Sequence, residues 1–213
     1  MNETKGRFRD ISLDSFVEKL TSDDPTPGGG SASALAGATA ASLVGMVTGL
    51  TLGKKKYKDV QQDVQQCAEE ANVLREELLD LSEEDSEAFE GVMAAIKMPK
   101  ETDKEKKARS RALQEATRQA TEVPRQIMIR CSSVLELAIK MAEIGNTNAV
   151  SDALVAGEIA IAGVRGATYN VKINLDSLKD EDYCKEVQEE MAEIEDSISD
   201  KRERLVELAD EHF

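Results

Sequence analysis

One segment of the chain, from Pro25 to Gly53, contains no charged residue, although 32% of the residues in the whole sequence are charged. It begins with a proline-containing turn and three glycines, continues with Ser31 as a possible cap, and then holds mostly small residues. This order predicts a loop followed by a helix. Because a helix without charges on any face is normally buried, we expect the other helices to pack around it.

Small residues recur every four positions along this helix, at Gly37, Ala41, Gly45 and Gly49. Residues four apart lie on the same side of a helix, so the pattern predicts one flank without bulky side chains. We expect a neighbouring backbone to approach closely along this flank.

The same segment is long enough to cross a lipid bilayer between Ala32 and Gly53, so a membrane span is the alternative interpretation. Large apolar side chains occupy few of its positions, however, and serine or threonine stands at positions 31, 33, 39, 42, 48 and 51. This composition favours a core helix without a membrane partner.

Aromatic residues make up only 3% of the sequence, and β-branched runs bounded by turn residues are nearly absent, which argues against strands. We predict a single all-α domain over residues 1–213, an up-and-down bundle of about six helices with a central helix rich in glycine and alanine. The expected helices are an amphipathic one capped by Ser12 or Asp14, the central one, two long ones over about 59–98 and 103–144, one over about 148–170, and a charged one over 179–213.

The formal net charge of −15 would repel a polyphosphate backbone, so we expect no nucleic-acid partner. Three cysteines are widely spaced, and the first ten residues show no signal-peptide pattern, which favours a reduced, cytoplasmic location. The only histidine, His212, lies next to the C-terminus, where a frayed end is common. We therefore expect no metal site.

Asp85 is the one charged residue in a long apolar seam that alternates steps of three and four residues from Val60 through Leu81 to Ala95. A buried carboxylate is costly unless it is paired, hydrogen-bonded or protonated. Asp85 could thus be a structural polar residue that fixes helix register, or the helix could bend so that Asp85 reaches water and Phe89 takes the core position. It could also be a carboxyl group with a raised pKa that acts as a general acid or base.

Two further groups of residues could bind an anion. The turn of Gly28, Gly29, Gly30 and Ser31 opens a helix, so its free N–H groups could bind a carboxylate, although a flexible connection needed for close packing explains the same glycines. A run of three lysines at 54–56 follows the central helix, where positive charge also stabilises the helix C-terminus.

The helix expected from about residue 148 also carries polar candidates. Asp152 and Asn170 are eighteen positions apart, five helical turns, and so share one face. Asn148 is also a plausible helix cap. Arg165 lies on a different face, where an ion pair with Glu158 is the ordinary interpretation.

The sequence contains, in this order, the stretches PTPGGGSASALAG, LTLGKKKY, EDSEAFEGVMAAIKMPK, GNTNAVSDALVA and RGATYNVKINL. Together they resemble the cyclodeaminase/cyclohydrolase family of folate enzymes, which includes the C-terminal domain of formiminotransferase-cyclodeaminase and free-standing methenyltetrahydrofolate cyclohydrolases. Their order and approximate spacing match from about Ser12 to about Glu190, so the resemblance covers nearly the whole chain.

This resemblance implies an all-α bundle that forms a homodimer, binds a reduced folate, and uses no metal, nucleotide or cofactor beyond tetrahydrofolate as the one-carbon carrier. In the family it resembles, the catalytic acid looks to be the aspartate of a D-x-x-A-F motif, which here is Asp85. The lysine run would face the carboxylates of a possibly polyglutamylated folate tail. The implied substrate-binding residues are Gly28, Gly29, Gly30, Ser31, Lys54, Lys55, Lys56, Asn148, Asp152, Arg165 and Asn170.

Two reactions are open. In cyclodeamination, our first expectation, N10 of 5-formiminotetrahydrofolate attacks the formimino carbon, an acid helps ammonia to leave, and 5,10-methenyltetrahydrofolate forms. In cyclohydrolysis, water adds to the methenyl carbon with help from a base and gives 10-formyltetrahydrofolate. No formiminotransferase-like segment precedes Met1, so we expect the chain to receive folate from solution. The alternative of another class is a non-catalytic helical scaffold, which a neutral residue in place of Asp85 would stabilise.

Overall fold

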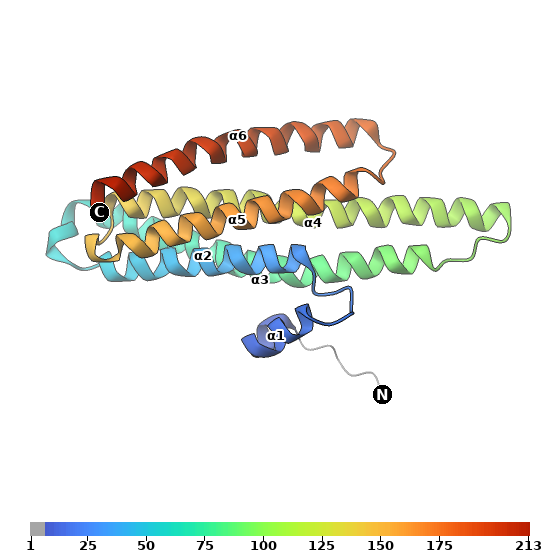
Figure 1. Ribbon diagram of the computed structural model, residues 1–213, viewed down its shortest axis with the longest axis horizontal. Helices are drawn as coiled ribbons and strands as arrows, with labels where there is room; N and C mark the ends of the chain where they lie inside the picture. Colours follow the sequence, from blue (N-terminus) through green and yellow to red (C-terminus); the bar gives the residue numbers. More distant parts are fainter. Residues whose placement is uncertain (1–6) are drawn as a thin grey trace.

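The computed structural model describes residues 7–213, and residues 1–6 lie outside the described part (Figure 1). Two expectations concern these first residues, namely that the domain includes them and that they show no signal-peptide pattern. For residues 1–6 both rest on the sequence alone. The described residues form no strand, which confirms the all-α prediction. Their elements are η1 Phe8–Asp10, α1 Leu13–Leu20, α2 Gly29–Thr51, η2 Lys55–Val60, α3 Gln61–Ile96, α4 Asp103–Ile144, η3 Thr147–Ala149, α5 Val150–Leu175 and α6 Glu181–His212.

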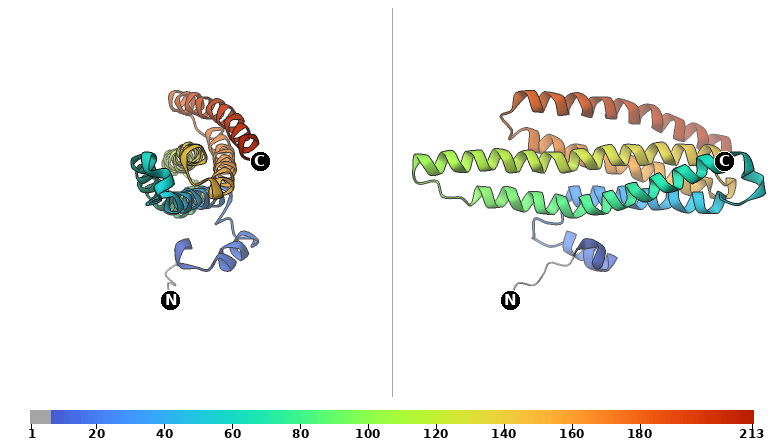
Figure 2. Two further views of the ribbon diagram at one scale, coloured as in Figure 1. Left: turned by 90° about the vertical axis from the view of Figure 1, so that its left-hand side faces the viewer. Right: turned by 180° about the vertical axis from the view of Figure 1, so that it is seen from behind.

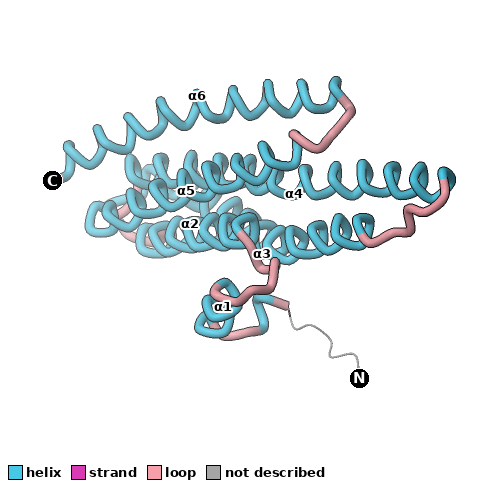
Figure 3. The backbone as a smooth tube through the Cα atoms, turned by 45° about the vertical axis from the view of Figure 1, so that its right-hand side comes forward, coloured by secondary structure: helices cyan, strands magenta, loops and turns pink. Residues whose placement is uncertain are grey.

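Helices α2 to α5 form the centre of the molecule. The glycine-rich helix α2 packs against α3, α4 and α5, as expected of the central helix. Helix α6 covers α4 and α5 on one side of the bundle, and α1 lies on the opposite side (Figures 1 and 2). Apart from the connection between α1 and α2, the loops lie at the two ends of the bundle (Figure 3), so the helices run up and down as predicted.

Side-chain caps set the starts of several helices. Ser12, and not Asp14, caps α1, because its hydroxyl accepts the N–H of the third helical residue. At the start of α4, Thr102 and Glu105 form a reciprocal capping box, and Asp180 caps α6. These local hydrogen bonds explain why the sequence predicts the helix starts to within a few residues.

The core helices approach closely where small residues meet Cys131 of α4. A Cβ placed at Gly37 of α2 would lie 2.4 Å from Cys131 Sγ, and one placed at Gly163 of α5 would lie 2.8 Å from the same sulfur. Both distances are far below van der Waals contact, so the absence of a side chain at these positions lets α2, α4 and α5 meet around one buried sulfur atom.

The prediction that another helix packs closely on the small-residue flank of α2 is correct at Gly37. It is wrong at Gly45 and Gly49, as far as contacts within one chain are concerned. No atom lies within 4 Å of a Cβ placed at either of these two glycines. Next to them, Met46 and Leu50 are 42% and 41% exposed. The C-terminal half of α2 therefore keeps one open face. Helices α3, α4 and α5 pack against its other faces.

Two segments of the described chain are long and apolar enough to cross a membrane, Gly29–Thr51 and Thr147–Leu175. In these segments 50% and 56% of the most apolar window is buried inside the bundle. The core helices of a bundle meet the same length and composition criteria, so this is weak evidence for a membrane span.

Gly37→Ala should lower the free energy of unfolding by about 1–3 kcal/mol, because the new methyl group collides with Cys131 Sγ and Leu78 in a closed core. Urea unfolding at a fixed protein concentration measures the change. The matched control is Gly91→Ala in α3, where a Cβ meets nothing within 4 Å and the helix should gain about 0.5–1 kcal/mol. Equal stability of Gly37→Ala and wild type would remove the claim of a close contact.

Candidate active site

The carboxylate of Asp85, in α3, caps the N-terminus of α2. Its Oδ2 accepts a hydrogen bond from the backbone N–H of Ser31 at 2.8 Å, and Ser31 Oγ lies 3.1 Å away as a second donor. Gly28, which precedes α2, has no side chain with which to cap the helix, so a neighbouring helix supplies the cap. A carboxylate is favourable at this place because the first N–H groups of a helix carry partial positive charge.

Glycine at position 30 makes room for this carboxylate. A Cβ at Gly30 would lie 2.0 Å from Asp85 Oδ1 and 2.5 Å from its carboxyl carbon. Any side chain would push Asp85 away from α2. Of the three glycines, Gly30 is therefore the one that the close approach of the carboxylate requires.

The seam of α3 is polar around Asp85. Ser82 and Ser86 are buried and lie one turn and one residue away from it. Ser31 Oγ is 2.9 Å from the carbonyl oxygen of Ser82 and 3.2 Å from Ser86 Oγ. A hydroxyl group has one proton, so Ser31 donates either to Asp85 or to the Ser82 carbonyl at any moment, and the carboxylate keeps only its backbone hydrogen bond when the hydroxyl turns away.

Burial raises the pKa of the Asp85 carboxyl above its ordinary value, while the hydrogen bonds from Ser31 act in the opposite direction. The side chain is half-buried. Among the described residues, Oδ2 receives the hydrogen bonds and Oδ1 receives none. Asp85 therefore presents one oxygen atom that can take or give a proton at a higher pH than an exposed aspartate.

Helix α5 brings an amide to the same place. A Cβ at Gly29 would lie 3.5 Å from Asn170 Nδ2, and this nitrogen donates to the carbonyl oxygen of Gly166 at 2.9 Å. Three helices thus meet at the start of α2. We call the residues there the α2 start cluster: Gly28, Gly29, Gly30, Ser31, Asp85 and Asn170.

The other predicted residues, apart from Arg165, lie at the opposite end of α2. The lysine run at 54–56 follows α2, and Lys56 Nζ donates to Thr147 Oγ1 at 3.0 Å, so the lysines and the start of α5 are neighbours. Asn148 and Asp152 belong to η3 and to the first turn of α5. Because α2 has 23 residues, about 34 Å separates its two ends. One chain does not bring the two groups together.

Arg165 belongs to neither group. Its neighbour Gly166 and Asn170 face α2, whereas Arg165 is exposed and lines a pocket toward α6 together with Tyr169 and Glu195. Asp152 and Asn170 share a face of α5 as predicted, yet they lie near its opposite ends. Shared helical phase does not place residues in one site when five turns separate them.

Three residues that the sequence analysis did not select stand beside the lysines. The backbone N–H of Thr147 donates to Tyr57 Oη at 3.0 Å, and Tyr57 Oη donates to Asn146 Oδ1 at 3.3 Å. Asn146 also holds the end of α2 through the carbonyl oxygen of Leu50 at 2.9 Å. Tyr57 ends the stretch LTLGKKKY, and Asn146 and Thr147 are near the start of GNTNAVSDALVA, so both motifs were visible but their contact was not.

Within residues 7–213, no three histidine, cysteine, aspartate or glutamate side chains are grouped closely enough to hold a metal ion. The α2 start cluster contains a single carboxylate, whereas metal sites in proteins use several such ligands. That the protein works without a metal stays a prediction.

Residues 12–193 match the protein family described as formiminotransferase-cyclodeaminase. The methenyltetrahydrofolate cyclohydrolase of Methylorubrum extorquens is 42% identical over 196 residues, which are 92% of this chain and 94% of that protein. The formimidoyltransferase-cyclodeaminase of Rattus norvegicus is 32% identical over 172 residues, which are 81% of this chain and 32% of that protein. The crystal structure of the formiminotetrahydrofolate cyclodeaminase of Thermotoga maritima is similar with a TM-score of 0.86 and 33% identity, over 94% of this chain and 96% of that one.

Asp85→Asn should change the pH dependence of stability. Because the pKa of Asp85 is raised in the folded state, its contribution to the free energy of unfolding is fully present below the unfolded pKa and is lost as pH rises through the folded pKa. The amide cannot titrate, so the variant should gain stability relative to wild type as pH rises from about 4, the ordinary pKa of an unfolded aspartate, until the folded carboxyl group is ionised. Urea unfolding at each pH measures this difference.

The matched control is Glu84→Gln, which replaces an exposed carboxyl group on the same helix and does not touch α2. A stability difference between Asp85→Asn and wild type that stays constant over this pH range would show that burial does not raise the pKa of Asp85.

Proposed function

Since the chain belongs to the formiminotransferase-cyclodeaminase family, we propose that it is a folate one-carbon enzyme that acts on a C–N bond of a tetrahydrofolate derivative at Asp85. The observation that carries this proposal is the Asp85 carboxylate, held by Ser31 at the start of α2 with Oδ1 free of hydrogen bonds from the described residues. Such a group disfavours the scaffold alternative, because the cap on α2 uses only Oδ2, whereas a free Oδ1 on a carboxyl group with a raised pKa suits proton transfer.

We assign the cyclohydrolase reaction first. The supporting observation is the 42% identity to a methenyltetrahydrofolate cyclohydrolase over nearly the full length of both proteins. Cyclodeamination, which we expected first from the sequence, is the second candidate, because the chain is similar to the Thermotoga maritima cyclodeaminase over 94% of its length.

Asp85 suits the proton transfers of both reactions. In cyclohydrolysis, its carboxylate takes a proton from water while the oxygen bonds to the methenyl carbon, and its charge balances that of the methenyl cation. The bond from this carbon to N5 then breaks, and N5 takes a proton. In cyclodeamination, the protonated carboxyl group gives its proton to the nitrogen that leaves as ammonia. A raised pKa strengthens the base in the first case and keeps the acid available in the second.

The other members of the α2 start cluster would position the substrate. The N–H groups of Gly29 and Gly30 have no acceptor among the described residues, and Asn170 adds an amide, so polar atoms of the folate ring could bind there. The lysines at 54–56 would bind carboxylates of a folate tail, as a second element of recognition at the far end of α2. We propose that the enzyme needs no further cofactor and acts in the cytoplasm.

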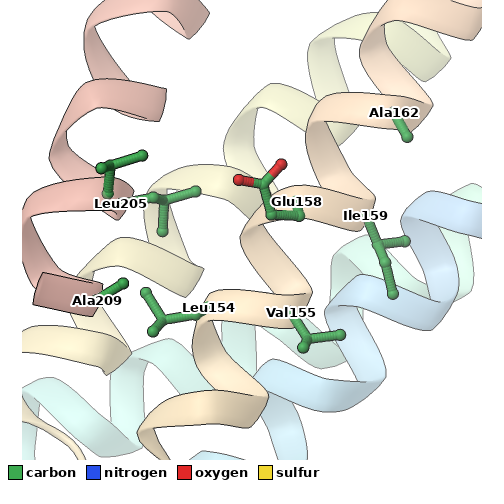
Figure 4. A pocket seen from close by; sticks show the side chains of 8 residues that line it. Leu154, Val155, Glu158, Ile159, Ala162, Leu205 and Ala209 are labelled. Atoms are coloured by element: carbon green, nitrogen blue, oxygen red, sulfur yellow. The ribbon is translucent and has the colours of Figure 1, made fainter. Parts of the chain in front are cut away.

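We also propose that the enzyme is a homodimer. Along the contact between α2 and α5, both helices expose apolar side chains. We call this surface the α2–α5 face, and its most exposed apolar residues are Met46, Leu50, Val155 and Ile173, between 41% and 68% exposed. At its border with α6, Val155 and Ile159 lie beside a groove of about 410 Å³ that Leu205 and Ala209 also line (Figure 4). A second copy of the chain would cover this face.

Asp85→Asn should lower kcat by about 10²–10⁴-fold, because the amide keeps the cap on α2 but cannot exchange a proton. Steady-state assays with 5,10-methenyltetrahydrofolate and with 5-formiminotetrahydrofolate test the variant and decide between the two reactions. Glu84→Gln, the exposed neighbour on α3, serves as control and should keep wild-type turnover. Near wild-type turnover of Asp85→Asn on both folates would disprove the catalytic assignment.

Sedimentation at micromolar concentration should give twice the chain mass of 23.2 kDa for the wild type. Met46→Glu combined with Leu50→Glu should give the single-chain mass, because two buried carboxylates in an apolar contact are not tolerated. The control is Val73→Glu on α3, which is 54% exposed and lies outside the α2–α5 face. A monomeric wild type, or a double variant that still dimerises, contradicts the proposed interface.

A further inference from the structure

The side chain of Tyr57 is held in one position at the end of the bundle far from Asp85. Its Oη accepts the N–H of Thr147 at 3.0 Å and is 3.3 Å from Asn146 Oδ1. Lys56 Nζ lies 5.2 Å from the centre of the Tyr57 ring and donates to Thr147 Oγ1 at 3.0 Å. We call Lys56, Tyr57, Asn146 and Thr147 the η2–η3 end. Tyr57 is half-buried and packs into no part of the core, so core packing does not explain why its hydroxyl is fixed.

These contacts make the phenol more acidic than an ordinary tyrosine. Hydrogen bonding from Thr147, with a smaller effect of Lys56, lowers the pKa of Tyr57 to about 8, although burial opposes the change. Among the groups that contact Tyr57, Lys56 from η2 is charged, while Thr147 of η3, its N-cap Asn146 and Gln61 of α3 are neutral. A phenol of this acidity can give and take protons in the neutral range.

The proposed reaction needs two proton transfers at different atoms. When water adds to the methenyl carbon, one of its protons goes to a base, and the bond to N5 breaks as N5 gains a proton. Water brings two protons. The equivalent of one of them ends on N5, and the other is released to the solvent in each turnover. Among the described residues, Asp85 is the only titratable side chain of the α2 start cluster, so a second proton-transfer group at this site would have to come from elsewhere in the protein.

Symmetry can bring Tyr57 to Asp85, although about 34 Å of α2 separates them within one chain. If two copies pack their α2–α5 faces about a two-fold axis perpendicular to α2, the η2–η3 end of each copy lies beside the α2 start cluster of the other. An axis parallel to α2 would instead place like ends together.

Charge favours the antiparallel arrangement. Residues 13–28, which lead into α2, expose four carboxylates and one lysine, and residues 52–60, which follow α2, expose four lysines and one aspartate. Arg7 and Arg9, farther from α2, form ion pairs with Asp80 of α3. Opposite ends therefore attract each other, whereas like ends would place lysines against lysines. The residues concerned are Asp14, Glu18, Lys19, Asp23 and Asp24 on one side and Lys54, Lys55, Lys56, Lys58 and Asp59 on the other.

We propose that Tyr57 of the partner subunit completes the site at Asp85 and acts as its second proton-transfer group. This inference rests on the proposed function, since it requires both the homodimer and the catalytic role of Asp85. Each dimer then has two sites, and each site takes its carboxyl group from one chain and its phenol from the other.

A mixed dimer of Asp85→Asn and Tyr57→Phe chains tests the proposal. Each variant alone should lose about 10²–10⁴-fold in kcat with 5,10-methenyltetrahydrofolate. When the two chains carry different affinity tags and are co-expressed, tandem purification isolates the mixed dimer. One of its two sites has both Asp85 and Tyr57, so it should recover about half of the wild-type turnover per dimer.

No recovery in the mixed dimer would overturn the proposal, because it would show that both residues serve the same chain or that Tyr57 is only structural. Failure to isolate any mixed dimer would overturn the homodimer and this inference together. Full activity of Asp85→Asn alone would overturn the proposed function. Full activity of Tyr57→Phe beside an inactive Asp85→Asn would overturn this inference only.

Two further measurements exclude a merely structural role. In Tyr57→Phe the limb of the kcat/KM profile near pH 8 should disappear, while sedimentation should still give the wild-type dimer; an unchanged pH profile contradicts the proposal. Tyr183→Phe is the matched control, since Tyr183 is a buried residue of α6 whose hydroxyl donates to Glu122 and lies outside both the α2 start cluster and the η2–η3 end. It should keep the wild-type turnover and pH profile.

Discussion

The hydrogen bond from the backbone N–H of Ser31 to the carboxylate of Asp85 joins the uncharged helix α2 to the most highly charged part of α3. The contact requires glycine at position 30, because a side chain there would occupy the space of the carboxyl group. One oxygen atom of Asp85 caps α2 and the other remains available for chemistry. A structural role and a catalytic role, which are alternatives from the sequence alone, are therefore compatible in one residue.

The same start of α2 depends on close packing deeper in the bundle. Gly37 and Gly163 let α2 and α5 close around Cys131 of α4. This approach fixes the distance between α2 and α5 along their whole contact, and it places Asn170 beside Gly29. The small residues thus act on the site from a distance, because a helix that is held close in its middle cannot separate at its end.

The length of α2 is the second constraint. Its 23 residues place the α2 start cluster and the η2–η3 end at opposite ends of α2, although both lie within the stretches on which the family resemblance rests. In the homodimer that we propose, a second copy packed antiparallel on the α2–α5 face would remove this separation, because a two-fold axis exchanges the ends of the helices.

The sequence by itself determined the helices, most of their boundaries and the exceptional position of Asp85, because caps and apolar periodicity act between residues close in the chain. Only the tertiary structure decided what Asp85 contacts, since its partner Ser31 lies 54 residues away. The contact of Thr147 with Tyr57 across 90 residues, and the open surroundings of Gly45 and Gly49, were likewise out of reach. Such contacts depend on how the helices pack against one another, and the pattern along a single helix does not specify its neighbours.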